Sequence, residues 1–211
     1  MRVRGRGSWV DRQLRDRGIH DERVLTAMER VPRELFVPEA SRELAYDDAA
    51  LPLACGQTIS QPYVVALICQ ALALAGDERV LDVGTGSGYQ AAVLAELARE
   101  VHSIERIPEL AERARGALKE AGYARVDVHV GDGTLGLPEL APYGGIAVAA
   151  AAPEVPPALW DQLAPGARIA LPIGTAQLQE LRVLERTSGG PRLLESVPVR
   201  FVPLLGEQGY S

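Results

Sequence analysis

The segment from Gly56 to Pro62 reads GQTISQP and places two hydroxyl and two amide side chains directly ahead of a proline. Ser60 is its natural candidate for a catalytic group, but no histidine or cysteine pair lies nearby to activate it, as a serine nucleophile requires. Ser60 could also cap the free amides of a helix that starts at Pro62. Three roles therefore stay open for this serine: a nucleophile, a helix cap, or a donor that only holds a substrate.

A glycine-rich turn is the strongest chemical signal in the chain. The run VLDVGTGSGY, residues 80–89, follows a hydrophobic strand and opens a helix, as a nucleotide-binding turn does. Gly84, Gly86 and Gly88 permit a tight turn and let a ligand approach the backbone closely. A dinucleotide enzyme would have glycine at the sixth position of the turn, where this chain has Tyr89. The spacing therefore argues against an oxidoreductase of the same fold class.

Three acidic residues lie near the ends of predicted strands in this region. Glu105 ends the strand after the glycine turn, where an acid can accept hydrogen bonds from ribose hydroxyls. Asp132 follows the third strand, although Asp-Gly pairs are also common in ordinary turns. Asp82 lies just before the glycines and can either bond to the turn or lie near a ligand.

Alternating strands and helices are expected to position these groups. Strands are predicted at 79–83, 101–105, 126–130, 146–150 and 167–173, and helices at 62–75, 89–98, 108–121 and 157–163. Short helices over 10–31, with Asp21 as an N-cap, precede them, and a hairpin at 179–185 and 193–202 follows. This order predicts an α/β fold with a doubly wound, mostly parallel sheet, an N-terminal helical cap and a C-terminal antiparallel hairpin.

We expect a single domain over residues 1–211. Residues 1–60 would form the helical cap and substrate loop, residues 61–175 the cofactor-binding core, and residues 176–211 the C-terminal hairpin and substrate-groove segment. No composition shift or linker divides the chain.

Composition limits the class of function. The net charge of -6 over 211 residues argues against a nucleic-acid partner, despite a short basic N-terminus. No segment approaches the ~18 apolar residues of a membrane span, and the N-terminus does not resemble a secretory signal. Cys55 and Cys69 cannot build a disulfide framework or a zinc cluster. We therefore expect a cytoplasmic protein without a metal and without membrane partners.

Longer stretches of the chain resemble the protein-L-isoaspartate O-methyltransferases, a family of class I S-adenosylmethionine-dependent methyltransferases. The stretches are VPRELFVPEA (31–40), AYDDAALPL (45–53), GQTISQPYVVA (56–66), VLDVGTGSGYQAAVLAEL (80–97), IERIPELAERAR (104–115), GDG (131–133), AAAPEVPPAL (150–159) and RFVPL (200–204). GQTISQP is the most specific of them, because the glycine turn alone fits any class I methyltransferase.

The resemblance implies a reaction. A methyl group would move from S-adenosylmethionine, leaving S-adenosylhomocysteine, to the free α-carboxylate of an L-isoaspartyl residue in a damaged protein or peptide. The ester would then cyclise without the enzyme and hydrolyse partly to aspartate, which is protein repair. A carboxylate with a reference pKa of about 3.9 or lower is already ionised at neutral pH, so the site needs positioning donors rather than a base. We expect a monomer.

The resemblance also implies residue roles. Ser60 is the expected catalytic residue, acting by positioning. The expected substrate contacts are Thr58, Ile59, Val202 and Pro203. The expected cofactor contacts are Asp82, Gly84, Thr85, Gly86, Gly88, Glu105, Asp132 and Gly133, with Asp82 near the methionine ammonium and Asp132 facing the adenine amine.

The chain departs from the family pattern in two places. It has Tyr143-Gly144-Gly145 where relatives have an aromatic residue and then Asp, and Ala149 where threonine or glycine is usual. Loss of the acid is expected to loosen the start of the fourth strand. Two other functions stay open: a class I methyltransferase that acts on a small molecule or RNA, and a non-catalytic module that binds S-adenosylmethionine.

Overall fold

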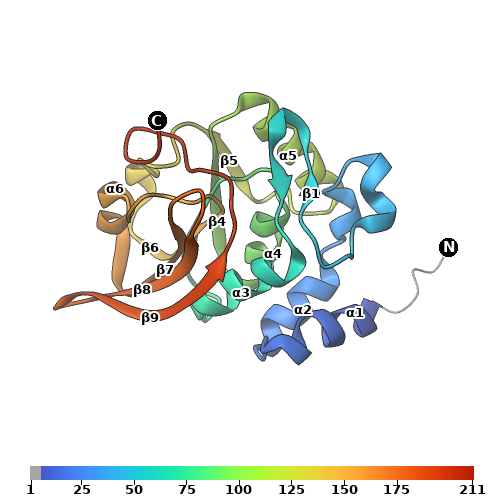
Figure 1. Ribbon diagram of the computed structural model, residues 1–211, viewed down its shortest axis with the longest axis horizontal. Coiled ribbons are helices and arrows are strands. Elements are labelled where there is room, and N and C mark those ends of the chain that lie inside the picture. Colours follow the sequence, from blue (N-terminus) through green and yellow to red (C-terminus); the bar gives the residue numbers. More distant parts are fainter. Residues whose placement is uncertain (1–5) are drawn as a thin grey trace.

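A seven-stranded sheet runs through the centre of the protein, with helices on both faces (Figure 1). The computed structural model describes residues 6–211, and residues 1–5 of the basic N-terminus lie outside this range. The strand order is β5-β4-β3-β6-β7-β8-β9. The strands are β3 (Arg79–Val83), β4 (Glu100–Glu105), β5 (Asp127–Val130), β6 (Tyr143–Val148), β7 (Leu163–Gly174), β8 (Gln179–Thr187) and β9 (Gly190–Val199).

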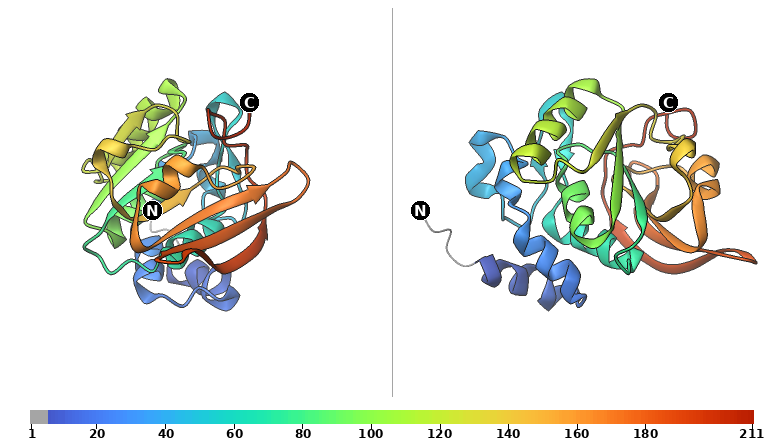
Figure 2. Two further views of the ribbon diagram at one scale, coloured as in Figure 1. Left: turned by 90° about the vertical axis from the view of Figure 1, so that its left-hand side faces the viewer. Right: turned by 180° about the vertical axis from the view of Figure 1, so that it is seen from behind.

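The first five strands of the sheet in chain order are parallel, and β8 and β9 add an antiparallel hairpin beside β7. The chain leaves β3 for β4 and β5 on one side and later returns to β6 on the other. This is the doubly wound arrangement that the strand–helix alternation predicts, and it is confirmed. Figure 2 shows the hairpin reaching out of the body, away from the N-terminal helices.

Six α-helices are present in the described range. They are α1 (Arg6–Gln13), α2 (Glu22–Arg30), α3 (Pro62–Leu72), α4 (Tyr89–Leu97), α5 (Pro108–Glu120) and α6 (Pro157–Asp161). Asp21 caps α2 as expected, because its Oδ1 accepts hydrogen bonds from the amides of Arg23 and Val24. No helix in residues 6–211 is long and apolar enough to cross a membrane.

Strand alternation divides the core between the two faces of the sheet. Val80 and Ala147 belong to the cluster under α1 to α5, whereas Leu81 and Ile146 belong to the cluster under α6. All four are fully buried. The sheet therefore presents its strand ends, not its faces, to a ligand.

Several elements differ from the expected bounds. Strand β7 begins at Leu163 rather than 167, α6 ends at Asp161 rather than 163, and β9 spans Gly190–Val199 rather than 193–202. Tertiary contacts explain two further differences, in α3 and β6. Helix α3 ends at Leu72, with Ala73 in a left-handed conformation (φ 50°), before the expected stop at Gly76. The following loop is held by Glu78, whose carboxylate accepts hydrogen bonds from the amides of Ala75 and Gly76. The hydrogen bonds that hold this loop therefore end the helix earlier than its apolar pattern predicts.

Strand β6 begins at Tyr143, three residues before the expected start, and its start is closely packed. The Tyr143 side chain is fully buried and donates a hydrogen bond to the Leu137 carbonyl at 2.8 Å. A Cβ on Gly144 would lie 2.6 Å from Cγ of Glu78. The pairing of β6 with β7 is nevertheless irregular between Tyr143 and Gly145, and glycine at position 144 lets Glu78 pack against the strand there.

A small hairpin precedes α3 and was not expected from the sequence. Strand β1 (Leu51–Pro52) pairs antiparallel with β2 (Thr58–Ile59), with Leu51 opposite Ile59. The fully buried Arg33 holds the end of this hairpin: its Nε donates to the Ala45 carbonyl at 2.7 Å and its Nη2 to the Ser60 carbonyl at 2.8 Å. Its guanidinium also lies 4.6 Å from the centre of the Tyr89 ring.

Arg33→Lys should lower the free energy of unfolding by about 2 kcal/mol, because an ammonium cannot replace two charge-assisted hydrogen bonds in a fixed fork. Urea denaturation measures this change. Arg30→Lys is the matched control: Arg30 is exposed and its side chain pairs with Glu96 on the surface, so its change should stay within about 0.5 kcal/mol. Equal effects of the two substitutions would contradict the anchoring role of Arg33.

Candidate active site

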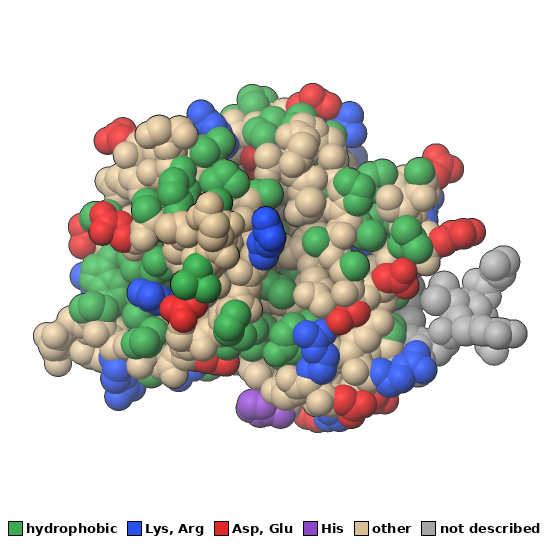
Figure 3. Space-filling model, in the orientation of Figure 1, with side chains coloured by type: hydrophobic (Ala, Val, Ile, Leu, Met, Phe, Trp, Pro, Cys, Tyr) green, Lys and Arg blue, Asp and Glu red, His purple; other side chains and the backbone are tan. Residues whose placement is uncertain are grey.

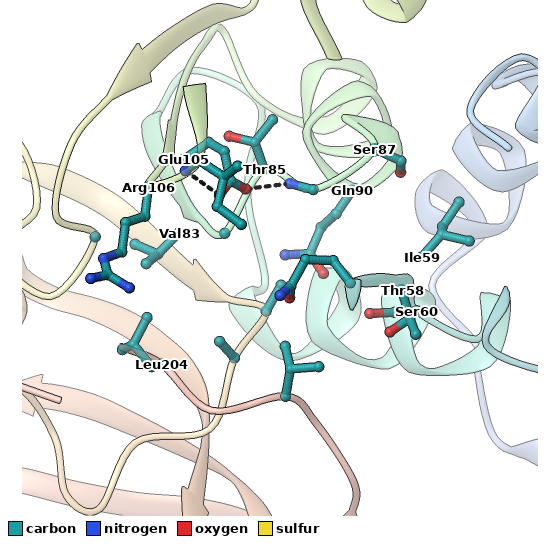
Figure 4. Close-up of a pocket in the computed structure, with 18 of the residues that line it drawn as sticks. Thr58, Ile59, Ser60, Val83, Thr85, Ser87, Gln90, Glu105, Arg106 and Leu204 are labelled. Carbon is teal, nitrogen blue, oxygen red and sulfur yellow. Dashed lines mark hydrogen bonds between the residues drawn. The ribbon is translucent and has the colours of Figure 1, made fainter. Parts of the chain in front are cut away.

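A pocket opens at the carboxyl ends of β3, β4 and β6, where the direction of chain winding reverses (Figure 4). Most of its lining comes from the end of β3 and the glycine turn with the start of α4, the end of β4 and the loop after it, the segment that contains β2, and the C-terminal segment; α3 and the loops after β5 and β6 add the rest. The lining residues are Gln57, Thr58, Ile59, Ser60, Val65, Val83, Gly84, Thr85, Gly86, Ser87, Tyr89, Gln90, Ile104, Glu105, Arg106, Ile107, Gly133, Ala149, Ala150, Val202, Pro203, Leu204 and Leu205.

The glycine turn has the backbone conformation that its spacing predicts. Gly84, Gly86 and Gly88 have φ values of 91°, 54° and 89°, which side-chain-bearing residues rarely adopt. Gly84 and Gly86 line the pocket, whereas Gly88 starts α4 behind it. A Cβ on Gly88 would lie 3.2 Å from Leu118, so this glycine serves the packing of α4 against α5.

Glu105 fixes the turn to the end of β4. One carboxylate oxygen accepts a hydrogen bond from the amide of Gly86 and the other from the amide of Ile107, both at 2.9 Å. Its side chain lines the pocket and is only 7% exposed. Each oxygen retains acceptor capacity for a further donor, such as a hydroxyl.

Asp82 lies behind the pocket wall and not in it. It is fully buried and accepts hydrogen bonds from the Ser103 hydroxyl at 2.6 Å and from Gln90 Nε2 at 2.8 Å. Ser103 is also 2.6 Å from the hydroxyl of Thr85 in the turn. Burial raises the pKa of Asp82 to about 6, although the two donors act in the opposite direction. Asp82 is therefore connected to the pocket through its hydrogen bond to Gln90, which lines the pocket.

Asp132 is also occupied by protein groups. Its Oδ1 accepts hydrogen bonds from the amide and hydroxyl of Thr134, and its Oδ2 accepts one from the amide of Glu207 at 2.8 Å. These donors, together with Arg106, lower the pKa of Asp132 despite partial burial. Asp132 lines a neighbouring pocket, which shares Arg106 and Leu205 with the main one, and its hydrogen bond to Glu207 fastens the C-terminal loop.

The opposite wall contains the hydroxyl-rich hairpin. Thr58, Ile59 and Ser60 line the pocket, and Figure 4 shows the hydroxyls of Thr58 and Ser60 close together on the α3 side. Ser60 does not cap α3: the N-cap is Gln61, and no side chain bonds to the first amides. The capping interpretation of Ser60 is therefore wrong.

The C-terminal segment completes this wall. Val202 and Pro203 line the pocket together with Leu204. The segment is held to the end of β6 through Ala151, whose amide donates to the Val202 carbonyl at 2.8 Å and whose carbonyl accepts from the Leu204 amide at 2.7 Å.

Ten of the thirteen expected site residues thus meet in one pocket, and the three that do not are Asp82, Gly88 and Asp132. The sequence did not single out Gln90 or Arg106, which also line it. Gln90 is a polar residue in an otherwise apolar stretch of α4, and Arg106 directly follows the acid at the end of β4. These two positions are the sequence signals from which Gln90 and Arg106 could have been identified as pocket residues.

The family model for protein-L-isoaspartate(D-aspartate) O-methyltransferase (PCMT) matches residues 8–209. The chain belongs to this family. A PCMT relative, "Protein-L-isoaspartate O-methyltransferase 2" from Marinobacter nauticus, is 59% identical over 207 residues, covering 97% of this chain and 94% of that protein.

Solved structures of the PCMT family have the same fold. A protein-L-isoaspartate O-methyltransferase matches with a TM-score of 0.84 and 28% identity, covering 97% of this chain and 67% of that one. A Plasmodium falciparum protein assigned to the same activity, in complex with S-adenosyl-L-homocysteine, matches with a TM-score of 0.80 and 26% identity, covering 94% and 97% of the two chains. The resemblance in sequence and the predicted fold are thereby confirmed.

Gly206→Ala should release the C-terminal loop from Asp132, because a Cβ at this position would lie 2.1 Å from Asp132 Oδ1. We expect the free energy of unfolding to fall by about 1–3 kcal/mol. The amide of Glu207 should also exchange hydrogen faster. Gly189→Ala is the control, since the nearest atom to its Cβ is the Thr187 hydroxyl at 3.7 Å. Unchanged protection of the Glu207 amide in the Gly206 variant would contradict this attachment.

Proposed function

We propose that this PCMT-family chain transfers a methyl group from S-adenosylmethionine to the free α-carboxylate of L-isoaspartyl residues in damaged proteins and peptides. One observation carries the proposal: a single pocket has the glycine turn and Glu105 on one side and the Thr58–Ser60 and Val202–Leu204 segments on the other. The methyl ester then closes to a succinimide without the enzyme and hydrolyses partly to aspartate, which begins the repair.

The residues on the first side fit S-adenosylmethionine. The turn exposes backbone at Gly84 and Gly86, and the Glu105 carboxylate can still accept ribose hydroxyls. A Cβ at Gly133 would lie 2.7 Å from Val83, so this part of the wall allows only glycine. When bound, the cofactor supplies an electrophilic methyl group on a positively charged sulfur. The described residues contain no cluster of three or more metal-ligating side chains.

The residues on the second side fit an ionised carboxylate that needs no base. We infer that the hydroxyls of Ser60 and Thr58 donate hydrogen bonds that orient the substrate, with Ser60 as the catalytic residue. Ile59, which is 3% exposed, and Val202 exclude water beside them. Exclusion of water favours this reaction because opposite charges are neutralised as the methyl group moves, and alignment supplies much of the remaining acceleration.

Roles for the three residues behind the pocket follow from their bonds. We infer that Asp82 acts on the cofactor through Gln90, that Gly88 sets the start of α4, and that Asp132 holds the loop beside the adenine end. Gly84, Thr85, Gly86, Glu105 and Gly133 keep their proposed cofactor contacts.

We also propose that the protein is cytoplasmic and monomeric. Cys55 and Cys69 are both free thiols, which fits a reducing compartment. The proposed cofactor and substrate segments lie in one pocket of a single chain, which fits a monomer. Figure 3 shows acidic and basic side chains interspersed on one face, without an extended basic patch for nucleic acid. Sedimentation at several protein concentrations tests the monomer.

The direct test uses labelled S-adenosylmethionine and two peptides that differ only in an aspartyl or isoaspartyl linkage. We expect label in the isoaspartyl peptide alone. Equal labelling of both peptides, or of neither, contradicts the proposal. Transfer to tRNA or a metabolite instead would favour a different methyltransferase, and cofactor binding without any turnover would favour a binding module.

Ser60→Ala should reduce kcat by about 10- to 100-fold, because it removes a hydrogen bond to a charged group. The affinity for S-adenosylhomocysteine, measured by calorimetry, should stay within about twofold. Because Ser60 is not a cap, the free energy of unfolding should also change little. Ser188→Ala, in the exposed turn between β8 and β9, is the control and should leave kcat unchanged. A normal kcat in the Ser60 variant would remove this serine from the mechanism.

A further inference from the structure

A fully buried arginine, Arg33, lies between the two walls of the pocket. It donates hydrogen bonds to the main-chain carbonyls of Ala45 and Ser60. Its third guanidinium nitrogen, Nη1, is buried and has no hydrogen-bond partner among the described residues. Burying a charge that is only partly hydrogen-bonded is costly, so stability alone does not account for an arginine at this position.

Ser60 depends on Arg33 for its position. It follows Ile59, the last residue of β2, and precedes Gln61, the N-cap of α3, so neither regular element holds it. In the range 6–211, Arg33 is the only residue that forms a hydrogen bond with Ser60. The bond engages the main-chain carbonyl, so the Ser60 hydroxyl remains available in the pocket. Arg33 therefore holds the backbone that carries this hydroxyl.

The same guanidinium also contacts the cofactor side of the pocket. Its carbon Cζ lies 4.6 Å from the centre of the Tyr89 ring, within the range of a cation–π contact. Tyr89 is buried, lines the pocket, and is the first residue of α4, directly after Gly88 of the glycine turn. Phe36 packs edge-on against this ring at 5.7 Å and restrains it further. One rigid group thus contacts both Ser60 and the start of the helix that follows the turn.

Methyl transfer depends on the distance between these two sides. The carboxylate oxygen forms a bond to the methyl carbon as the carbon–sulfur bond opposite breaks, and the electron pair of that bond stays on sulfur. The reacting atoms must start about 3–3.5 Å apart, and an error of about 1 Å can cost about 100-fold in rate. A side chain that fixes the separation of the two walls therefore affects the rate without touching either ligand.

We propose that Arg33 is a positioning residue for methyl transfer, which holds the Ser60 backbone at a fixed separation from the glycine turn. The proposal rests on the proposed function. A guanidinium suits this role because its planar fork bonds to carbonyls of two different segments while it contacts the Tyr89 ring. An ammonium on a flexible stem cannot make these contacts together.

Steady-state kinetics with S-adenosylmethionine and an isoaspartyl peptide test the proposal for two variants. Arg33→Lys keeps the charge but loses the fork, and Arg33→Met loses both. We expect kcat to fall about tenfold or more in both variants, with KM for S-adenosylmethionine within about twofold of the wild type. Titration with S-adenosylhomocysteine counts the folded sites in each sample, so kcat refers to folded protein alone. A normal kcat in Arg33→Lys would overturn the proposal.

Two controls separate positioning from stability. Val183→Ala removes buried methyl groups from β8, outside the pocket, and should lower stability without changing kcat. Arg30→Lys changes an exposed arginine on α2 and should alter neither quantity. An equal fall of kcat in Val183→Ala and Arg33→Lys would show that lost stability explains the effect, and the positioning role would be wrong.

A double-mutant cycle tests whether Arg33 acts through Ser60. In the Ser60→Ala background there is no hydroxyl to position, so Arg33→Lys should change kcat by no more than about twofold, while its effect on unfolding persists. Independent losses of kcat that multiply would contradict the proposal. A raised KM for the peptide with normal kcat would also contradict it, because that result indicates a role in uniform substrate binding.

The backbone dynamics of Ser60 give a readout that does not depend on turnover. The NMR order parameter of its amide should fall from the ~0.85 of a rigid backbone toward ~0.6 in Arg33→Lys, and should stay unchanged in Val183→Ala. An unchanged value in Arg33→Lys would overturn the proposal. If the wild type methylated no isoaspartyl peptide, the proposed function itself would fail. A wild type that methylates this peptide, with Arg33 variants equally active, would overturn only the part assigned to Arg33.

Discussion

The site depends first on how the protein accommodates the carboxylate of Asp82 inside the sheet. Burying this group is costly unless donors reach it, and the two donors come from different elements. Ser103 donates a hydrogen bond to Asp82 from β4, and Gln90 donates one from the first turn of α4. Since Ser103 also bonds to Thr85, the glycine turn, the following helix and the neighbouring strand are fixed relative to one another by one carboxylate. The rest of the pocket is assembled against this rigid corner.

A second constraint places the proposed substrate wall, formed by Thr58–Ser60 and Val202–Leu204, opposite that corner. Arg33 comes from the N-terminal region and bonds to the carbonyl of Ser60, while the C-terminal segment is fastened by Ala151 on one side and by Asp132 on the other. The two halves of the wall are separated in sequence by the whole cofactor-binding core. Their distance from the glycine turn is set by packed tertiary contacts, so the wall is as rigid as the core beneath it.

Much of the fold was predictable because its signals are local. Strand β3 and helix α5 have strong periodicity and clear glycine or proline ends, and their bounds agree with the structure to within a residue. The β1–β2 hairpin has two-residue strands, too short for any periodicity. The early end of α3 depends on Glu78 and on Arg23, which donates to the carbonyls of Leu74 and Leu97, and these contacts have no sequence signature.

The site was predictable to the extent that position along a strand decides it. Glu105 ends its strand and faces the pocket, as the spacing from the glycine turn suggests. Spacing does not tell which groups satisfy a carboxylate, so it could not reveal that Asp82 and Asp132 are bonded within the protein. Gln90 escaped notice for the same reason: its hydrogen bond to Asp82 is visible only in the folded protein.

The distribution of charge across the pocket matches the chemistry of its two ligands. The carboxylates of Glu105 and Asp82 lie on the side proposed for the cofactor, where a positively charged ligand would benefit from them. The substrate wall contains hydroxyls and apolar side chains but no lining cation. An arginine paired with the substrate carboxylate would bind it more tightly and also draw electron density from the attacking oxygen. The one buried cation near this wall, Arg33, is bonded instead to backbone carbonyls, including that of Ser60. The proposed arrangement thus orients the carboxylate with neutral donors and leaves its charge available for methyl transfer.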